Sequence, residues 1–296
     1  MLMKLRNVVG LSISPMSVCH PIPFVALLVY SWVGGSGVEL LQCLIFTFVF
    51  LSAVNLWNHY NDVVEDSLSR KRTILAIDVG LRRTVGVLSI VLYLVALIVV
   101  MIGSNVLVFL PSLIVTWLYS DRALLGDRRL KNHYITETLT YIVAVPSYVL
   151  TLWLFFSNVN LRAILVAVAV TSLMLSGTFL KDIGDYTGDR SAGLRTLAVV
   201  CTPSLLLKLH YVTVWFYYIT ILSGVVVGAF TKIALLALIP SILTIYTSIG
   251  FQKSGWRLTS STVRYLKSNM VSILLSLLLL MLSGFLSPTW RTFLYS

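Results

Sequence analysis

Charged residues are scarce in this chain, and their scarcity excludes a soluble globular protein. Only 11% of the 296 residues are Asp, Glu, Lys or Arg, whereas 58% are hydrophobic, and the mean hydropathy is +0.93. A globule of this size would have too little polar surface to cover it. Cysteine is also rare, and the three cysteines show no CxxC spacing. A disulfide framework and a zinc site are therefore disfavoured.

Long apolar blocks are what the sequence has in abundance. We identify nine that approach the roughly 20 helical residues needed to cross a membrane, at about 18–36, 38–57, 84–103, 105–120, 134–156, 162–180, 209–229, 232–250 and 268–286. The first follows Lys4 and Arg6 as a signal peptide would, but it lacks a small-residue cleavage site, so we interpret it as a retained span. The blocks predict an all-α membrane protein, with nine transmembrane helices in one domain over residues 1–296.

Basic residues are unevenly distributed between the connections on the two sides of these blocks. If the N-terminus is cytoplasmic, all 22 Lys and Arg residues except Arg162, Lys232 and Arg291 fall on the cytoplasmic side. Positive residues accumulate on that side of membrane proteins, which predicts a cytoplasmic N-terminus in a multi-pass protein of the cell membrane. Contact with membrane lipids accounts for most of these cations. No basic-aromatic module is present, so nucleic acid is not an expected partner.

Acidic residues are confined to the same side even more strictly. Of the eleven Asp and Glu residues, only Glu39 falls on the outer side. Acidic residues follow no topology rule of their own, so their confinement calls for a functional reason. The long inner connections, at about 58–83, 121–133, 181–208 and 251–267, provide room for a site, whereas the outer connections are very short.

Some of these acidic residues belong to an internal repeat. Asp62-Val-Val-Glu-Asp66 is followed by Arg72-Thr73, and Asp185-Tyr-Thr-Gly-Asp189 is followed by Arg195-Thr196. Both copies read D-x3-D-x5-R-T, within residues 58–73 and 181–196, after the second and sixth blocks. We interpret them as the acidic motifs of two related helical halves. Membrane proteins commonly place a site at the interface of such repeats.

The candidate metal ligands share an oxygen donor and a place on one of two helical faces. They are Asn58, Asp62 and Asp66 at i, i+4 and i+8 on a helix expected to continue from the second block, and Asp182, Asp185 and Asp189 at i, i+3 and i+7. Like charges packed this closely near a low-dielectric boundary need a cation. Hard oxygen donors on two elements suit Mg²⁺ bound to a diphosphate. The alternative, two solvated loops with local salt bridges, leaves the matched spacing unexplained.

Basic residues on the same face complete the predicted site. Arg72 and Arg195 follow the two motifs at the same distance, Lys181 directly precedes Asp182, and Lys131 lies in the intervening connection. Arginine and lysine side chains neutralise the negative charge of a leaving diphosphate. We therefore expect these four cations, together with Asn58, to bind the diphosphate.

In these residues the chain resembles the UbiA superfamily of intramembrane prenyltransferases. Its members have nine-helix bundles, an NDxxDxxxD motif after the second helix and a DxxxD motif after the sixth. The corresponding stretches here are Asn58-His-Tyr-Asn-Asp62-Val-Val-Glu-Asp66 and Asp185-Tyr-Thr-Gly-Asp189, and the whole of 181–196 is similar. Tyr119-Ser120 looks like the family's tyrosine-containing loop. His59 departs from the pattern, standing where the first Asp is usual.

The resemblance implies Mg²⁺-dependent transfer of a polyprenyl group from its diphosphate to a lipophilic acceptor. It implies catalytic roles for Asp62, Asp66, Asp185 and Asp189. The distribution of basic residues predicts that this active site is on the cytoplasmic side. The first expected acceptor is an aromatic quinone precursor, and the alternative is geranylgeranylglyceryl phosphate in ether-lipid synthesis. An ion-coupled secondary transporter is the alternative from another class. Transporters place charges near the bilayer midplane, however, and these apolar blocks are nearly free of charge.

Overall fold

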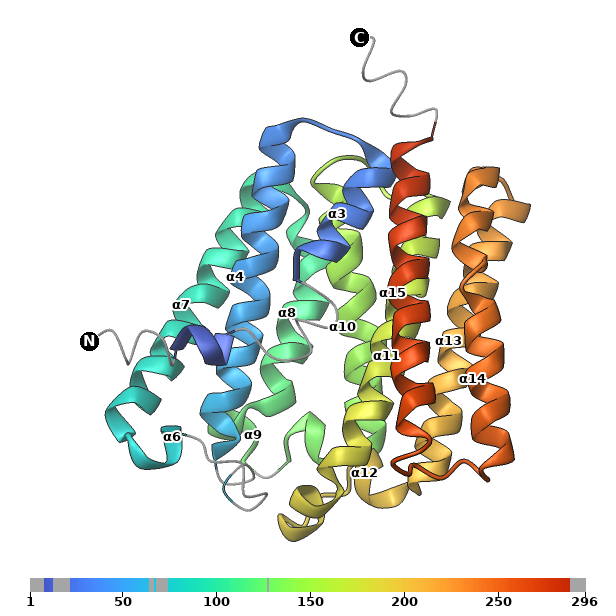
Figure 1. The fold of residues 1–296 in the computed structure, drawn as a ribbon. Helices are drawn as coiled ribbons and strands as arrows, with labels where there is room; N and C mark the ends of the chain where they lie inside the picture. Colours follow the sequence, from blue (N-terminus) through green and yellow to red (C-terminus); the bar gives the residue numbers. More distant parts are fainter. Residues whose placement is uncertain (1–7, 13–21, 64–66, 68–73, 127, 288–296) are drawn as a thin grey trace.

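The computed structural model describes residues 8–12, 22–63, 67, 74–126 and 128–287, and its elements are all helical (Figure 1). In chain order the elements are α3 (Ile22–Val33), α4 (Gly37–Asn61), α6 (Ile74–Ile77), α7 (Val79–Gly103), α8 (Val106–Ser120), α9 (Arg122–Leu125), η1 (Leu130–Asn132), α10 (Tyr134–Leu154), α11 (Leu161–Ser191), α12 (Leu197–Val200), α13 (Pro203–Val226), η2 (Lys232–Leu238), α14 (Ser241–Lys253) and α15 (Val263–Phe285).

Seven helical segments are long and apolar enough to cross a membrane. They are α4, α7, α10, α11, α13, the continuous segment Lys232–Lys253 and α15. The apolar helices α3 and α8 are shorter. Each of the nine predicted blocks thus overlaps a helix of the described chain, but only seven meet the length and composition of a span. These helices make the chain an integral, multi-pass membrane protein.

The long helices pack side by side into one bundle (Figure 1). α4 packs on α7, α10 lies between α8 and α11, α13 packs on α11, and α14 packs on α15. Buried aromatic rings fill the interior of the first half. Phe46 and Phe50 of α4 each contact the ring of Phe109 on α8, with centroids 5.1 and 5.0 Å apart. Edge contacts of this kind stabilise the packing beyond the apolar area they bury.

Hydrogen bonds between buried polar side chains join the later helices. The His210 ring on α13 bonds to the Ser176 hydroxyl on α11 at 2.7 Å and to the Asn269 amide on α15 at 2.8 Å. Tyr217 and Ser276 form a further bond, of 2.9 Å, between α13 and α15. Polar pairs of this kind hold helices together inside a bilayer, where packing gains little from the hydrophobic effect.

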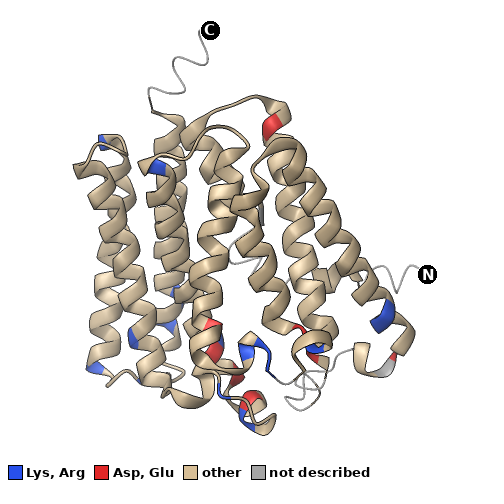
Figure 2. Cartoon of the chain, turned by 180° about the vertical axis from the view of Figure 1, so that it is seen from behind, with Lys and Arg blue, Asp and Glu red and all other residues tan. Residues whose placement is uncertain are grey.

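Charges of the described residues gather at one end of the bundle, and few lie at the other end (Figure 2). Glu39, the single outer acid predicted from the sequence, forms a capping box with Ser36 at the start of α4. Arg162 donates to the carbonyls of Ala229 at 2.6 Å and Trp32 at 3.1 Å. Glu39 and Arg162 therefore have local structural partners. A catalytic site is expected at the opposite end of the bundle.

Candidate active site

The first acidic motif begins where α4 ends. Asn61 is the last helical residue, and Asp62 is the C-cap, with its N–H donating to the Asn58 carbonyl at 2.9 Å. The prediction of one unbroken helix from Asn58 to Asp66 is therefore wrong, because the helix is interrupted at Asp62. At this end of α4 the buried Asn61 amide donates to the Trp57 carbonyl and accepts from the Arg122 N–H.

Asp66 and Arg72, both predicted site residues, lie outside the described residues. Of the candidate metal ligands in the first motif, the structure therefore describes Asn58 and Asp62.

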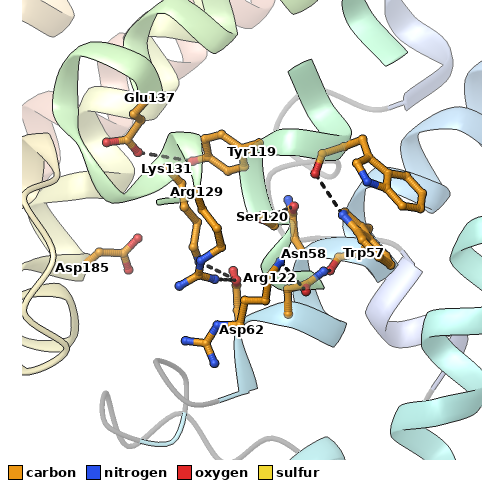
Figure 3. Close-up of polar contacts among 12 residues, drawn as sticks. Trp57, Asn58, Asp62, Tyr119, Ser120, Arg122, Arg129, Lys131, Glu137 and Asp185 are labelled. Atoms are coloured by element: carbon orange, nitrogen blue, oxygen red, sulfur yellow. Dashed lines mark hydrogen bonds and ion pairs between the residues drawn. The ribbon is translucent and has the colours of Figure 1, made fainter. Parts of the chain in front are cut away.

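Two buried cations bind the Asp62 carboxylate. Lys131 Nζ lies 2.5 Å from Asp62 Oδ1, and Arg129 Nη1 lies 3.3 Å from the same oxygen (Figure 3). The Arg129 side chain is only 1% exposed, and that of Lys131 is 11% exposed. Their positions follow from the single 3₁₀ turn η1, which begins at Leu130 between them. The 121–133 connection thus brings Arg129 and Lys131 into contact with Asp62.

The end of α8 connects the first motif to α10. Ser120 Oγ donates to Asn58 Oδ1 at 2.7 Å, and the Tyr119 hydroxyl donates to Glu137 Oε1 at 3.3 Å (Figure 3). The Trp57 and Trp117 rings stack with centroids 4.1 Å apart, which fixes α4 against α8. The Tyr119-Ser120 pair therefore closes a helix, and both side chains point to other site residues.

The second acidic motif lies on the last turns of α11, a helix of 31 residues that continues beyond its apolar block to Ser191. This confirms that Asp182, Asp185 and Asp189 occupy helical positions i, i+3 and i+7, and so share one face. Lys181 Nζ lies 2.9 Å from Asp185 Oδ2 and 3.4 Å from Asp182 Oδ1. Asp182 is 1% exposed, and its Oδ2 has no hydrogen-bond partner within the described chain.

Backbone hydrogen bonds attach the segment after the second motif to the loop that carries Lys131. The Arg195 N–H donates to the Asn132 carbonyl at 3.0 Å, and the Tyr134 N–H donates to the Arg195 carbonyl at 2.9 Å. Thr196 Oγ1 donates to Asp189 Oδ2 at 2.6 Å. Arg195 is exposed, so its described contribution to the site is the backbone pairing.

Three buried charged residues are missing from the predicted set: Asp121, which caps α9 and accepts from the Trp117 ring N–H at 3.1 Å, Arg129 and Glu137. Arg129 contacts Asp62 directly, and Glu137, 3% exposed, also accepts the Leu197 N–H at 3.5 Å. A sequence signal existed for Glu137, because a carboxylate in the first turn of an apolar helix is costly and commonly functional. For Arg129 the only signal was its place in a basic loop, shared with Arg128.

The two motifs face a common region, with Arg129 and Lys131 drawn between Asp62 and Asp185 (Figure 3). No group of three or more His, Cys, Asp or Glu residues in the described ranges is arranged to hold a metal ion alone. The donors nevertheless fit Mg²⁺, which usually takes one or two carboxylates and completes its shell with waters and substrate phosphates. The unpartnered Asp182 oxygen also fits a nearby cation.

Comparisons with known proteins identify relatives of this chain. The model of the UbiA prenyltransferase family matches residues 21–273. An uncharacterized protein of Archaeoglobus fulgidus is 32% identical over 270 residues, covering 88% of this chain and 92% of that protein. Such a match over nearly the whole of both chains indicates a shared fold throughout.

Solved structures share the same fold at lower identity. A digeranylgeranylglyceryl phosphate synthase has a TM-score of 0.70 at 15% identity, covering 96% of this chain and all of that one. A UbiA homologue from Aeropyrum pernix has a TM-score of 0.66 at 14% identity, covering 91% and 97%. A UbiA homologue from Archaeoglobus fulgidus, bound to GPP and Mg²⁺, has a TM-score of 0.62 at 13% identity, covering 94% and 98%. With its family match spanning most of the sequence, the chain belongs to the UbiA prenyltransferase family.

Proposed function

We propose that this protein transfers a polyprenyl group from its diphosphate to a lipophilic acceptor in the membrane, with Mg²⁺ as cofactor. One observation carries the proposal: a carboxylate bound by two buried cations faces a row of three carboxylates at one end of an apolar bundle. That arrangement suits a donor with a diphosphate head and a hydrocarbon tail. The head would bind among the charges, and the tail would lie among the apolar helices.

The proposed metal ligands are the oxygen donors of the two motifs. Asp62, Asp185 and Asp189 are the main carboxylates, with Asn58, Asp182 and Asp66 completing the proposed set. UbiA homologues from Archaeoglobus fulgidus have been solved with GPP and Mg²⁺ and with DMAPP and Mg²⁺, which supports the choice of metal. When bound, Mg²⁺ supplies positive charge to the diphosphate oxygens.

The proposed chemistry starts at the allylic C–O bond of the donor. This bond breaks, and its electron pair leaves on pyrophosphate. Lys131, Arg129 and Lys181 stabilise the negative charge that develops there. The acceptor's nucleophilic atom then forms a bond to the allylic carbon and loses its proton. Asp62 and Asp185 hold Lys131 and Lys181 at 2.5 and 2.9 Å before the substrate arrives, so these cations need little rearrangement.

Two acceptors are candidates. An aromatic quinone precursor remains the first, as the resemblance implies. Geranylgeranylglyceryl phosphate is the second, and the fold shared with a digeranylgeranylglyceryl phosphate synthase favours its inclusion. We also propose that the charged end of the bundle is cytoplasmic, because it holds most of the basic residues.

Pyrophosphate release from purified protein in lipid vesicles tests the proposal. The protein is given geranylgeranyl diphosphate and Mg²⁺, with p-hydroxybenzoate, a naphthoate or geranylgeranylglyceryl phosphate as acceptor. We expect release that depends on one acceptor class and is lost with EDTA. Absence of both release and Mg²⁺-dependent donor binding would contradict the proposed reaction. Release with the glyceryl phosphate alone would replace the first acceptor with the second.

A further inference from the structure

The lipid-facing surface of α14 and α15 carries a groove that the proposed reaction does not use. It lies between α14 and α15, has a volume of about 490 Å³, and is lined by Ile239, Pro240, Ile242, Leu243, Tyr246, Leu275, Leu278 and Leu279. Exposed apolar side chains surround it on both helices. In a membrane-spanning bundle this groove faces the hydrocarbon chains of the lipids.

Each wall of the groove continues along one helical face to an exposed lysine. On α14 the face runs through Ile242, Tyr246, Ile249 and Lys253, and on α15 it runs through Leu278, Leu275, Val271 and Lys267. Successive members are three or four residues apart, so each set lies along one side of its helix. Lys253 and Lys267 therefore lie on the same helical faces as the residues that line the groove.

The dimensions fit one leaflet of a bilayer. Ile242 to Lys253 and Leu278 to Lys267 are each eleven residues apart, or about 16 Å along a helix. Half of a hydrocarbon core of roughly 30 Å is nearly the same length. An acyl chain in the groove would thus bring its phosphate to the level of the lysines.

Aromatic packing holds the two lysine-bearing helix ends together. The Tyr265 ring of α15 lies 5.8 Å from the Tyr246 ring and 5.9 Å from the Phe251 ring of α14, measured between centroids. Gly250 permits this approach, since a Cβ there would lie 2.7 Å from the Tyr265 ring. The lysines are therefore held at the same end of the helix pair.

The charge of this region is of one sign. The sequence contains no Asp or Glu after Asp189, while Lys208, Lys253, Arg257, Arg264 and Lys267 are all exposed on α13, α14, α15 or the connection between the last two. Figure 2 shows blue and no red on these helices. An anionic headgroup would meet no repelling carboxylate from the helices that form the groove.

We propose that the α14–α15 groove binds an anionic phospholipid of the surrounding membrane. One acyl chain occupies the groove, and the headgroup phosphate lies at Lys253 and Lys267. This lipid is distinct from the prenyl donor. The groove opens on the lipid-facing perimeter of the bundle, and none of its lining residues belongs to the acidic motifs.

Native mass spectrometry of protein released from bilayers of equal phosphatidylglycerol and phosphatidylcholine tests this site. Wild-type protein should retain phosphatidylglycerol preferentially. Lys253→Gln/Lys267→Gln should reduce that preference by about threefold to tenfold, since each cation near a lipid surface contributes modestly. Leu278→Trp fills the groove and should reduce retention of both lipids. The matched control Arg83→Gln/Lys232→Gln removes two exposed cations elsewhere and should keep the preference.

Three outcomes would overturn the proposal: an unchanged preference in the lysine variant, an equal loss in the control, or full retention in Leu278→Trp. Displacement of the lipid by millimolar inorganic phosphate would also overturn it, because it would identify a site for free anions. Gel filtration of each variant establishes that the fold is retained.

Discussion

At the scale of single residues, the pairing of Asp62 with Lys131 and Arg129 is the central contact of the candidate site. Removing one partner of a fully buried ion pair costs about 3–5 kcal/mol, and the cost here is smaller because the Asp62 side chain is 21% exposed. Two cations share one oxygen here, so their positive charge exceeds what Asp62 neutralises. This local surplus suits an arriving diphosphate, while the carboxylates of the second motif suit the Mg²⁺ that would accompany it.

Replacing Lys131 tests this reading. We expect Lys131→Met to lower turnover about 100-fold, as for the loss of one preorganised group that stabilises developing charge. Arg129 should keep the loop in place, since it also contacts Asp62. Lys232→Met, an exposed lysine at the opposite end, is the control and should retain wild-type turnover. Steady-state pyrophosphate release measures both variants, and equal activity in the two would remove Lys131 from the site.

Site residues could be predicted from the sequence where their spacing matched the period of a helix. Asp182, Asp185 and Asp189 were identifiable because a helical period placed them on one face, and α11 confirms that placement. Arg129 was not, because Arg128 and Arg129 are chemically equivalent in sequence. Arg129 precedes the turn that begins at Leu130, and this turn packs against both α8 and α10, a tertiary contact that the local sequence does not show.

At the scale of elements, the decisive link is the segment after α11. The Arg195 backbone pairs on both sides with residues 132 and 134, so the second motif and the Lys131 loop are held as one unit. Thr196 adds a side-chain bond to Asp189. The repeated R-T dipeptide of the sequence is thus explained in its second copy: the threonine orients a carboxylate, and the arginine backbone joins two loops.

Thr196→Val removes the hydroxyl that orients Asp189 while keeping the shape of the side chain. A hydrogen bond to a charged group contributes about 1.5–3 kcal/mol, so we expect turnover to fall roughly tenfold to 100-fold. Thr196→Ser restores the hydroxyl and should recover most of the activity. Titration with Mg²⁺ gives a second readout. Only the valine variant should need a higher Mg²⁺ concentration to reach half of its maximal turnover. Wild-type behaviour of Thr196→Val would show that the bond has no role in catalysis.

Helices were more predictable than their ends. Apolar blocks located every long helix, because crossing a bilayer demands a long uncharged run. The end of α4 was mispredicted, since the spacing of Asn58, Asp62 and Asp66 suggested a continuing helix. Asn61 instead forms side-chain bonds to Trp57 and Arg122, and this tertiary contact could not be read from the local pattern.

At the scale of the whole molecule, the separation of charge between the two ends organises both topology and function. The charged end holds the acidic motifs, the buried cations and the exposed lysines of the last helices (Figure 2). The opposite end holds Glu39 and Arg162, which stabilise turns, and the exposed Lys232. Under the proposed topology, this asymmetric distribution places the charged end at the cytoplasmic surface, where a diphosphate is soluble.

Cysteine labelling tests the proposed orientation. Lys232→Cys and Ser260→Cys place exposed thiols at opposite ends of the bundle. In intact cells a membrane-impermeant maleimide should label Lys232→Cys, whereas Ser260→Cys should react only after permeabilisation. The reverse pattern would place the charged end outside.

The most direct test of the central claim, that both acidic motifs act together with Mg²⁺, is turnover of matched Asp→Asn variants in vesicles. Asp62→Asn and Asp185→Asn should each lower Mg²⁺-dependent pyrophosphate release about 100-fold or more. Asp78→Asn is the matched control: Asp78 caps α7 through the Leu81 N–H at 2.8 Å, and asparagine caps equally well. It should retain wild-type turnover. Wild-type turnover in either motif variant, with the fold intact, would contradict the account.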